Sequence, residues 1–364
     1  MKLKEICRTL EQWAPLSYQE SYDNSGLLVG NPEMEVNGAL VALDVTEEVL
    51  QEAIDKKCNL IIAHHPLVFS GMKRFTGANW VERCLIFAIK NDLAIYAIHT
   101  NLDNVHTGVN AKIAEKLGLK NTRTLMPKKG QLTKLVVYCP KSHAEKVRTA
   151  MFDAGAGTIG NYEACSFNSE GLGTFRANEE ANPHVGERGK LHAEPEFRIE
   201  VVLPQAIQGK VVKAMIEAHP YEEVAYDCYE LQNSFERLGA GMIGELEAAI
   251  PLMDFLNQLK NRLNAKGIRY TSAHTTEVRK IAVCGGSGSF TLPAAIAAGA
   301  DVLVTADFKY HQFFDADGQI TIADVGHYET EQFTSELIRD YLHEKFPTFA
   351  LILTEVNTNP INYL

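Results

Sequence analysis

The sequence lacks a hydrophobic run long enough to cross a lipid bilayer. A membrane-spanning helix needs about 20 predominantly apolar residues, and no stretch of the 364-residue chain approaches that length. The first residues also lack the apolar segment and small-residue cleavage site of a secretory signal. They carry Ile6, Leu10 and Trp13 at the spacing of one helix face. We therefore expect a cytoplasmic protein, with no membrane partner, that begins with an amphipathic helix.

Basic charge is also scarce. The chain carries 35 Lys and Arg residues against 46 Asp and Glu residues, a formal net charge of -11 at pH 7. Binding to a nucleic-acid backbone depends on clustered Lys and Arg side chains that displace counterions. We therefore expect no direct nucleic-acid partner, and a role connected with transcription would have to act through other proteins.

Paired cysteine motifs are absent as well. The seven cysteines are an odd number and include no C-x-x-C spacing. Cys58, Cys139 and Cys284 lie inside or beside apolar runs that are typical of buried strands. This pattern favours a reducing compartment over a disulfide framework, in agreement with the expected cytoplasmic location.

Apolar residues, in contrast, are plentiful, and their spacing predicts the fold. They make up 46% of a chain that exceeds the usual size of a single core, so we expect two domains. Apolar runs alternate with segments of helical period over residues 38–99, and the alternation returns over residues 280–346. Such alternation is typical of crossover units. Residues 1–129 and 235–364 are predicted to form one discontinuous α/β domain with largely parallel sheet layers flanked by helices.

The middle of the chain has a different pattern of apolar and polar residues, which predicts an inserted α+β domain at residues 130–234. Its apolar and helical segments follow the order strand, helix, strands, helix, strand, which is the ferredoxin-like pattern. Residues 177–194 lack periodicity and are rich in Gly, Pro and charge, so we expect an exposed hairpin loop there.

Metal-capable side chains follow four of the predicted strands. Because parallel sheets bind ligands beyond the carboxyl ends of their strands, these side chains are expected to meet. A single histidine after a strand is more often structural, and a His-His-Pro sequence can be a simple turn. The convergence at four strand ends favours a metal site instead. The side chains are His64 and His65, then His99 and Asp103, then Asp307 and His311, and last Asp324, His327 and Glu331.

The spacing of these residues favours two metal ions over one. Pro66 promotes an extended backbone at the residue before it, and adjacent residues of an extended chain point in opposite directions. Two neighbouring ions could therefore take one imidazole each from the His-His pair. His327 and Glu331 share one face of a predicted helix, where the carboxylate could bridge both ions. Asp103 would add an anionic oxygen, and this donor set suits Zn, Mn, Fe, Co or Ni.

A glycine-rich turn, CGGSGSF, follows the predicted strand that contains Cys284. It could present backbone N–H groups to a phosphate at the start of a helix. It lacks the lysine of a P-loop, so a plain tight turn is an equal alternative. Cys284 itself has no evident base to activate it as a nucleophile.

Together these motifs resemble the NIF-three-like dinuclear metal-binding family, many of whose members carry the name GTP cyclohydrolase 1 type 2 homologue. The resemblance covers essentially the whole chain. It rests on YDNSGLLVG at Tyr22 to Gly30, IIAHHPLVFSG at Ile61 to Gly71, HTNLDNVHTGVN at His99 to Asn110, GGSGSF at Gly285 to Phe290, TADFKYHQ at Thr305 to Gln312, and DVGHYETE at Asp324 to Glu331.

The resemblance implies that two divalent metal ions are held by His64, His65, Asp103, His327 and Glu331. It also implies that the insertion is similar to PII and CutA regulatory modules, through the segment AHPYEEVAYD at Ala218 to Asp227. Members of this family form ring-shaped homohexamers, which is the assembly that the resemblance implies here.

Besides a role in transcription through protein partners, which only the naming of the family suggests, two functions remain open. The first is a metal-dependent hydrolase acting on a small nucleotide or phosphoester, because two ions about 3.5 to 4 Å apart can activate water and stabilise a leaving oxygen. His99, Asp307 and His311 are then the candidates for moving protons or orienting ligands. The alternative is a non-catalytic metal-binding scaffold whose PII-like insertion senses a ligand or a protein partner.

Overall fold

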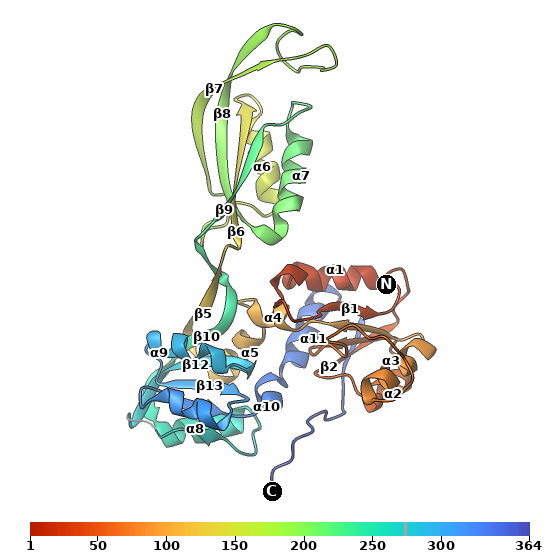
Figure 1. Ribbon diagram of the computed structural model, residues 1–364, viewed down its shortest axis with the longest axis vertical. Coiled ribbons are helices and arrows are strands. Elements are labelled where there is room, and N and C mark those ends of the chain that lie inside the picture. The colour runs from red at the N-terminus through yellow and green to blue at the C-terminus, as the bar shows by residue number, and fades with distance from the viewer. Residues whose placement is uncertain (273–274) are drawn as a thin grey trace. The chain divides into compact units, whose positions relative to one another are not determined.

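The computed structural model describes residues 1–272 and 275–364 and separates into two compact units. The main unit comprises Met1–Pro127 and Glu236–Leu364, and the inserted unit comprises Lys128–Phe235. Figure 1 shows the elements in chain order. The predicted α/β class, with sheets flanked by helices, is confirmed. None of the helices formed by the described residues has the length and apolar character needed to cross a membrane.

The first sheet of the main unit is parallel except at one edge. Its strands lie in the order β1 (Gly26–Val29), β4 (Ala94–Ala97), β3 (Leu60–Ala63), β2 (Gly38–Ala42) and β15 (Ala350–Leu353). Only β1 runs antiparallel to its neighbour. The central strands are apolar on both faces because both faces are covered. Val41 and Ile62 point to one core, and Leu40 and Ile61 point to another.

Short helices connect and cover these strands. Two of them begin at capping side chains: Thr46 accepts a hydrogen bond from the Val49 amide at 3.3 Å, and Asn79 accepts one from the Glu82 amide at 2.9 Å. The helices are α1 (Leu3–Trp13), η1 (Leu16–Tyr18), α2 (Glu47–Asp55), α3 (Trp80–Lys90), α4 (Thr100–Asn104) and α5 (Val109–Leu117). As expected, α1 is amphipathic: it buries Ile6 and Leu10.

The second sheet of the main unit has a parallel centre and antiparallel flanks. Strands β12, β13 and β14 are parallel, whereas β10 and β11 run antiparallel to them. The order is β11 (Arg269–Tyr270), β14 (Thr321–Asp324), β13 (Val302–Ala306), β12 (Glu277–Ser287), β10 (Ser234–Pro251) and β5 (Lys120–Lys129). Its helices are α8 (Leu252–Arg262), η3 (Ser289–Thr291), α9 (Leu292–Ala297), η4 (Tyr310–Ala316), α10 (His327–Glu331) and α11 (Thr334–Lys345).

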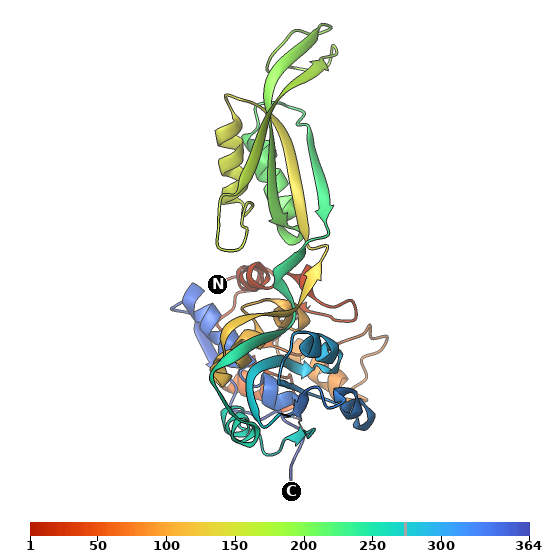
Figure 2. The same cartoon turned by 90° about the vertical axis from the view of Figure 1, so that its left-hand side faces the viewer.

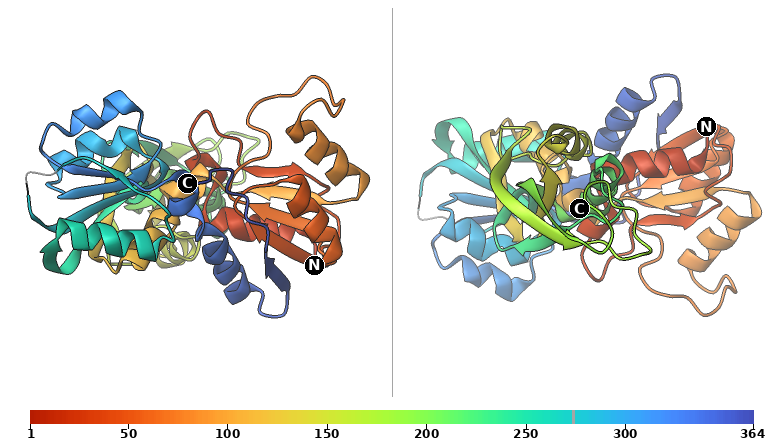
Figure 3. Two further views of the ribbon diagram at one scale, coloured as in Figure 1. Left: turned by 90° about the horizontal axis from the view of Figure 1, so that it is seen from below. Right: turned by 90° about the horizontal axis from the view of Figure 1, so that it is seen from above.

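One hydrophobic core is shared by both sheets of the main unit. Val41 and Ile62 from the first sheet belong to the same buried cluster as Val283 and Val304 from the second. Each such side chain contributes roughly 1.5 to 3 kcal/mol when it leaves water. In Figure 3 strands β1 to β4 of the first sheet are red and orange, and the central strands of the second sheet are cyan and blue. Because they share a core, side chains that follow strands of both sheets can meet in one site.

The elements of the inserted unit follow the order strand, helix, two strands, helix and strand. Its strands pair in the antiparallel order β7 (Ser166–Arg176), β8 (Leu191–Pro204), β6 (Leu132–Pro140) and β9 (Tyr226–Leu231). Figure 2 shows α6 (Ala144–Asp153, yellow) and α7 (Gln208–Ala218, green) on one face of this sheet, and a turn, η2 (Gln205–Ile207), precedes α7. Val147 and Met215 of these helices pack on Val137 and Ile199 of the strands. The hairpin loop is shorter than predicted, because β8 already begins at Leu191.

Candidate metal centre

Side chains that follow strands of both sheets converge in one cluster of the main unit. His64 and His65 follow β3. His99 follows β4 and immediately precedes α4, which carries Asp103. The short helix α10 begins and ends with the last two members, His327 and Glu331. All of them lie where the predicted strand-end pattern puts them, at or beyond the carboxyl ends of parallel strands.

The Glu331 carboxylate lies at the centre of this cluster. Its Oε2 atom is 2.9 Å from His65 Nε2 and 3.0 Å from His327 Nε2. Its Oε1 atom is 3.8 Å from His64 Nε2, which is 3.6 Å from Asp103 Oδ1. The ligand atoms thus form two groups that share Glu331: His65 with His327, and His64 with Asp103. His99 forms a further group with His64 and His65.

Two buried atoms of the cluster test whether a cation fits there. His64 Nε2 and Asp103 Oδ1 are buried and have no hydrogen-bond partner among the described residues. Leaving such atoms unsatisfied costs free energy, so native proteins rarely do so. The His65 and His327 Nε2 atoms also lie only 3.3 Å apart. Lone pairs and carboxylate oxygens gathered in this way are the donors that a divalent metal ion binds, so the residues fit such an ion.

The other ring nitrogen of each histidine is held by an acceptor outside the cluster. A carbonyl or carboxylate oxygen can only accept, so Nδ1 carries the hydrogen and Nε2 offers its lone pair to the cluster. The pairs are His64 with Ile98 O at 2.8 Å, and His65 with Asp44, His99 with Asp23 and His327 with Asp307, each at 2.7 Å. These hydrogen bonds orient the rings before any ligand arrives.

The clustered carboxylates perturb the ionisation of the rings. Burial lowers the pKa of His64, which is 0% exposed, and so favours the neutral ring that binds metals. Burial acts in the same direction on His65 and His327, but Glu331 with Asp44 or Asp307 outweighs it. The pKa of His65 rises to about 10 and that of His327 to about 11. The same negative charge that favours these protons favours a divalent cation in their place.

The two carboxylates of the cluster itself are shifted in opposite directions. Burial and the nearby Glu331 raise the pKa of Asp103 well above its ordinary value. Burial also tends to raise the pKa of Glu331, but the three histidines around it, led by His327, lower it well below its ordinary value. Glu331 therefore carries the negative charge of the site, and this charge disfavours the ionised form of Asp103.

The orientation of the His-His pair differs from the prediction. The two rings do not point in opposite directions: their centroids are 4.9 Å apart, and both Nε2 atoms reach the same cluster. The reason is that β3 ends at Ala63, so His64 and His65 lie in a bend where strand alternation no longer applies. Two ions are instead suggested by the two oxygens of Glu331, because Oε1 faces His64 and Oε2 faces His65.

The glycine-rich turn lies against Glu331, and its first two amides are bonded within the protein, so they are not free to bind a phosphate. The Gly285 amide donates to Asn110 Oδ1 and the Gly286 amide to Thr330 Oγ1, both at 3.0 Å. Gly286 has φ +58°, and a Cβ atom there would lie 2.3 Å from Glu331 Oε1. Glycine is needed at this position both for the backbone conformation and for the close approach of the carboxylate.

The three residues nominated for proton transfer have different positions. His99 lies in the cluster, and Asp307 holds His327 from outside it. His311 is exposed and contacts the rings of Tyr310 and Phe314, so it does not reach the cluster. Cys284 lines the cavity beside the cluster, and burial raises the pKa of its thiol, which opposes a nucleophilic role as expected.

Two carboxylates of the site were not singled out by the sequence patterns. Asp44 is the second residue after β2, so the strand-end rule applied to that strand also finds it. Asp23 lies in a loop, where its carboxylate accepts from the Thr100 amide at 3.0 Å as well as from His99. No hydrophobic periodicity identifies Asp23 in the sequence. Only the family resemblance of the segment at Tyr22 to Gly30 pointed to that loop.

The cluster opens into a cavity of about 690 Å³ with an aromatic rim. Tyr22, Phe69, Trp80 and Phe290 line it, and each is more than half exposed. Among the described residues that line the cavity, none is a lysine or an arginine. The cavity therefore combines flat apolar surfaces at its rim with a polar floor of carboxylates and imidazoles.

Helix-covered parallel sheets with His and carboxylate donors at their strand ends define an α/β protein with a site that could hold metal ions. The chain belongs to the DUF34/NIF3 family. The profile of this family, described as Duf34/NIF3 (NGG1p interacting factor 3), matches residues 1–360. The family resemblance predicted from the motifs is thereby confirmed.

Relatives and solved structures match over nearly their full lengths. A Halalkalibacterium halodurans protein named GTP cyclohydrolase 1 type 2 homolog is 40% identical, over 99% of this chain and 98% of its own. A Bacillus subtilis protein of the same name is 38% identical with the same coverage. The crystal structure of a Bacillus cereus protein related to NIF3 has a TM-score of 0.90 at 41% identity, covering 100% of this chain and 99% of that one. The crystal structure of the Staphylococcus aureus protein SA1388 has a TM-score of 0.78 at 30% identity, with the same coverage.

Proposed function

We propose that the protein is a dinuclear metal-dependent hydrolase that acts on a small nucleotide or phosphoester. The observation that carries the proposal is the division of donor atoms between the two oxygens of Glu331. His65 and His327 would hold one ion, His64 and Asp103 the other, and Glu331 would bind both. Zn, Mn, Fe, Co and Ni all suit these donors. When bound, two such ions would supply activation of water and neutralisation of charge on a leaving oxygen.

His99 is the residue proposed to move a proton. Its Nδ1 atom is held by Asp23, and its ring lies 5.3 Å from that of His64 and 5.4 Å from that of His65, measured between centroids. Nε2 therefore lies beside the donors and can accept or release a proton there. Asp307 is a positioning residue for His327, and we assign no step to His311.

The cavity lining supports a planar substrate of low charge. Aromatic faces such as those of Phe69 and Trp80 stack on nucleobases, each stacking contact contributing roughly 1 to 3 kcal/mol. Since no described lining residue is Lys or Arg, metal ions would have to neutralise the substrate's phosphates. We therefore expect a nucleoside or a nucleoside monophosphate to bind better than a triphosphate.

The name shared by the relatives makes GTP the first triphosphate to test. Cyclohydrolase chemistry requires water to attack a ring carbon of the purine and open the ring. A purine base bound between the aromatic rim and the metal centre would be placed for such a reaction. Hydrolysis of a phosphoester bond at the same centre would give a different product from the same nucleotide, so product analysis separates the two reactions.

The test begins with metal content. Purified wild type is expected to hold about two ions per chain, and His64→Ala and Glu331→Ala fewer. His311→Ala, a histidine outside the cluster, is the matched control and should equal wild type. All four proteins are then assayed with GTP, GMP, guanosine and a phosphodiester. If the wild-type protein holds stoichiometric metal but turns over none of these four compounds, the hydrolase proposal is overturned.

A non-catalytic scaffold is the second candidate, and one observation favours it. The inserted unit contributes none of the proposed ligands and has a cavity of its own. Because β5 and β10 are neighbours in their sheet, a short turn can replace residues 130–234. If metal binding and hydrolysis survive this deletion, the insertion serves regulation. Loss of hydrolysis alone would assign it to the substrate site.

The proposed assembly and location follow from the family resemblance and the cysteines. We propose a homohexameric ring, which light scattering on the eluted protein would test. We also propose a cytoplasmic location, which fractionation of cells would test. The seven cysteines, all without disulfide bonds, suit a reducing compartment.

A further inference from the structure

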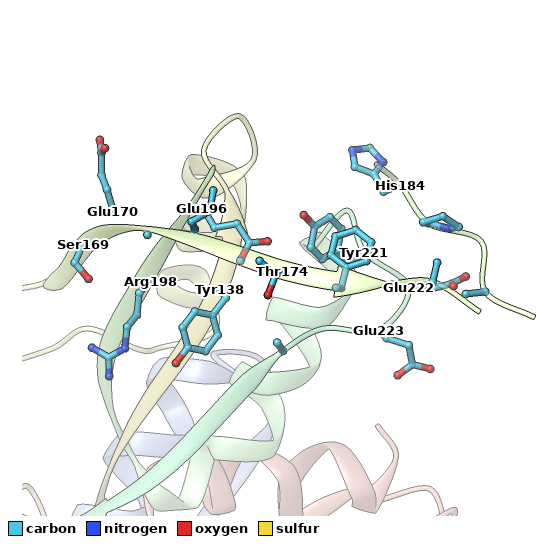
Figure 4. Close-up of a pocket in the computed structure, with 18 residues that line it drawn as sticks. Tyr138, Ser169, Glu170, Thr174, His184, Glu196, Arg198, Tyr221, Glu222 and Glu223 are labelled. Carbon is cyan, nitrogen blue, oxygen red and sulfur yellow. The ribbon is translucent and has the colours of Figure 1, made fainter. Parts of the chain in front are cut away.

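The inserted unit contains a cavity that is separate from the metal centre. It measures about 530 Å³, a size that holds small molecules, and its lining comes entirely from residues of this unit. Strand β7 contributes a continuous stretch of the lining, and residues that precede β9 contribute another. Figure 4 shows the side chains that line the cavity.

Aromatic rings form one part of this lining. Tyr138, Phe175 and Tyr221 all border the cavity, and the ring centroids of Phe175 and Tyr221 are 6.1 Å apart. His184 lies beside Tyr221, with 6.2 Å between ring centroids. The faces of such rings carry negative partial charge, which attracts cations.

A buried carboxylate forms the second part. Glu196 is only 8% exposed, and no basic side chain among the described residues forms an ion pair with it. Figure 4 shows its carboxylate between Thr174 and Tyr221. The Tyr221 hydroxyl is buried without a hydrogen-bond partner in the described part of the chain. Burial and the Glu196 carboxylate raise the pKa of this phenol, so it stays protonated.

The backbone leaves room for Glu196. A Cβ atom at Gly173 would lie 2.2 Å from Glu196 Oε2, so any larger residue on that part of β7 would displace the carboxylate. A buried carboxylate without an ion-pair partner costs free energy, and a bound cation would lower that cost. The absence of a side chain at Gly173 allows Glu196 to stay there.

The remaining charges of the lining are also mostly negative. Glu222 and Glu223 line the cavity, and neither forms an ion pair with a described residue. Arg198 is the single arginine among the described lining residues, none of which is a lysine, and it is already paired with Glu200. An anionic ligand would thus meet repulsion, whereas a cation would meet attraction from several sides.

We propose that this cavity binds a small organic cation, an aliphatic amine whose ammonium group pairs with Glu196 and packs on the aromatic rings. Additional ammonium groups of a polyamine would face Glu222 and Glu223. The site is independent of the metal centre and of the hydrolase proposal, because the two cavities share no lining residue.

Calorimetric titration of the full-length, metal-loaded protein with spermidine tests the proposal at physiological salt, where diffuse attraction is screened. Wild type should bind one spermidine per chain. Glu196→Gln, which keeps the shape and removes the charge, should weaken binding at least about tenfold. Gly173→Ala, which keeps the charge and displaces the carboxylate, should weaken it as well. Thermal unfolding of each variant confirms that it is folded.

Two controls separate this site from other attractions. Glu217→Gln removes the same charge from an exposed position on α7, outside the lining, and should leave the affinity unchanged. His64→Ala should also bind spermidine normally, even where it loses metal. Equal binding by wild type and Glu196→Gln would overturn the proposal. So would the failure of wild type to bind spermidine, or tighter binding of a tricarboxylate such as citrate than of spermidine.

Discussion

Glu331 Oε2 lies 2.9 Å from His65 Nε2, although 266 positions separate the two residues in the chain. His65 follows a strand of the first sheet and Glu331 ends a helix beside the second. The contact therefore exists only because both sheets share one core. It also joins the two halves of the main unit, which the inserted unit separates in sequence. Substitutions that displace Glu331 should weaken metal binding before they affect other properties of the protein.

Gly286→Ala should impair metal binding without removing a ligand. The new Cβ would lie 2.3 Å from Glu331 Oε1, and the backbone there has φ +58°. We expect a loss of stability of about 1 kcal/mol or more from the backbone conformation, together with reduced metal content. Chelator competition and thermal unfolding measure the two effects. Gly71→Ala is the control, since no heavy atom lies within 4 Å of its Cβ position. Equal metal affinity in both variants would contradict the expectation.

Asp44→Asn should weaken metal binding through His65. The Asp44 carboxylate accepts from His65 Nδ1 at 2.7 Å and from the Thr358 hydroxyl at 2.6 Å. Removing its charge makes the imidazole a weaker donor and loosens its orientation, which typically costs about 10 to 100-fold in metal affinity. Isothermal titration with zinc measures the change. Thr358→Val, which removes only the outer hydrogen bond, should show a smaller loss, and the reverse order would argue against this role.

Trp80→Ala should weaken the binding of guanosine and leave metal content unchanged. Trp80 is 53% exposed and lines the rim of the metal cavity. Loss of one stacking face should cost roughly 1 to 3 kcal/mol, a factor of about 5 to 150 in affinity. Calorimetry with the metal-loaded protein measures it. Tyr162→Ala, which removes an exposed ring from the inserted unit, is the control. Unchanged guanosine affinity in Trp80→Ala would remove the rim from the substrate site.

Ile62→Ala should destabilise the main unit strongly. Ile62 is 0% exposed and lies in the core shared by the two sheets. Removing its outer carbons leaves a cavity between them, which costs about 2 to 5 kcal/mol. Urea unfolding of the full chain measures the loss. Ile89→Ala, at a position 60% exposed, should change the free energy of unfolding by no more than about 0.5 kcal/mol.

The inserted unit should lose stability in mild acid because of His219. Its Nε2–H donates to the Tyr138 carbonyl at 3.0 Å, and its Nδ1 accepts from the Tyr221 amide at 3.1 Å, so only the neutral ring fits. Burial lowers the pKa of His219, the Tyr138 carbonyl partly opposes this, and His143 and His184 add to it. The unfolded chain therefore binds the proton more tightly than the folded chain.

The sign of this pH dependence follows directly. The contribution of His219 is complete above its unfolded pKa of about 6.5 and is lost as the pH falls below that value. Melting temperatures of wild type should drop between about pH 7.5 and about pH 5.5. His219→Gln should be less stable at the higher pH but should lose less on acidification. A parallel decline in both proteins would assign the acid sensitivity to other groups.

The sequence predicted the class of fold because its signals are local. Apolar runs such as those of β2 and β3 are short and continuous, as strands covered on both faces must be, and the helices between them repeat at their own period. The strand-end rule then gathered His64, His65, His99, Asp103, His327 and Glu331 without any knowledge of their distances. The motifs also carried enough identity for the family to be recognised.

Orientation and distance depended on the tertiary structure. The bend after β3 turned both histidines toward one cluster, against the alternation that an extended chain predicts. His311 follows a strand as His99 does, yet the structure leaves it exposed because the chain passes into η4 away from the cluster. Asp23 reaches His99 across 76 positions. Periodicity describes which way a residue faces on its own element, and long-range packing decides which other side chains it meets.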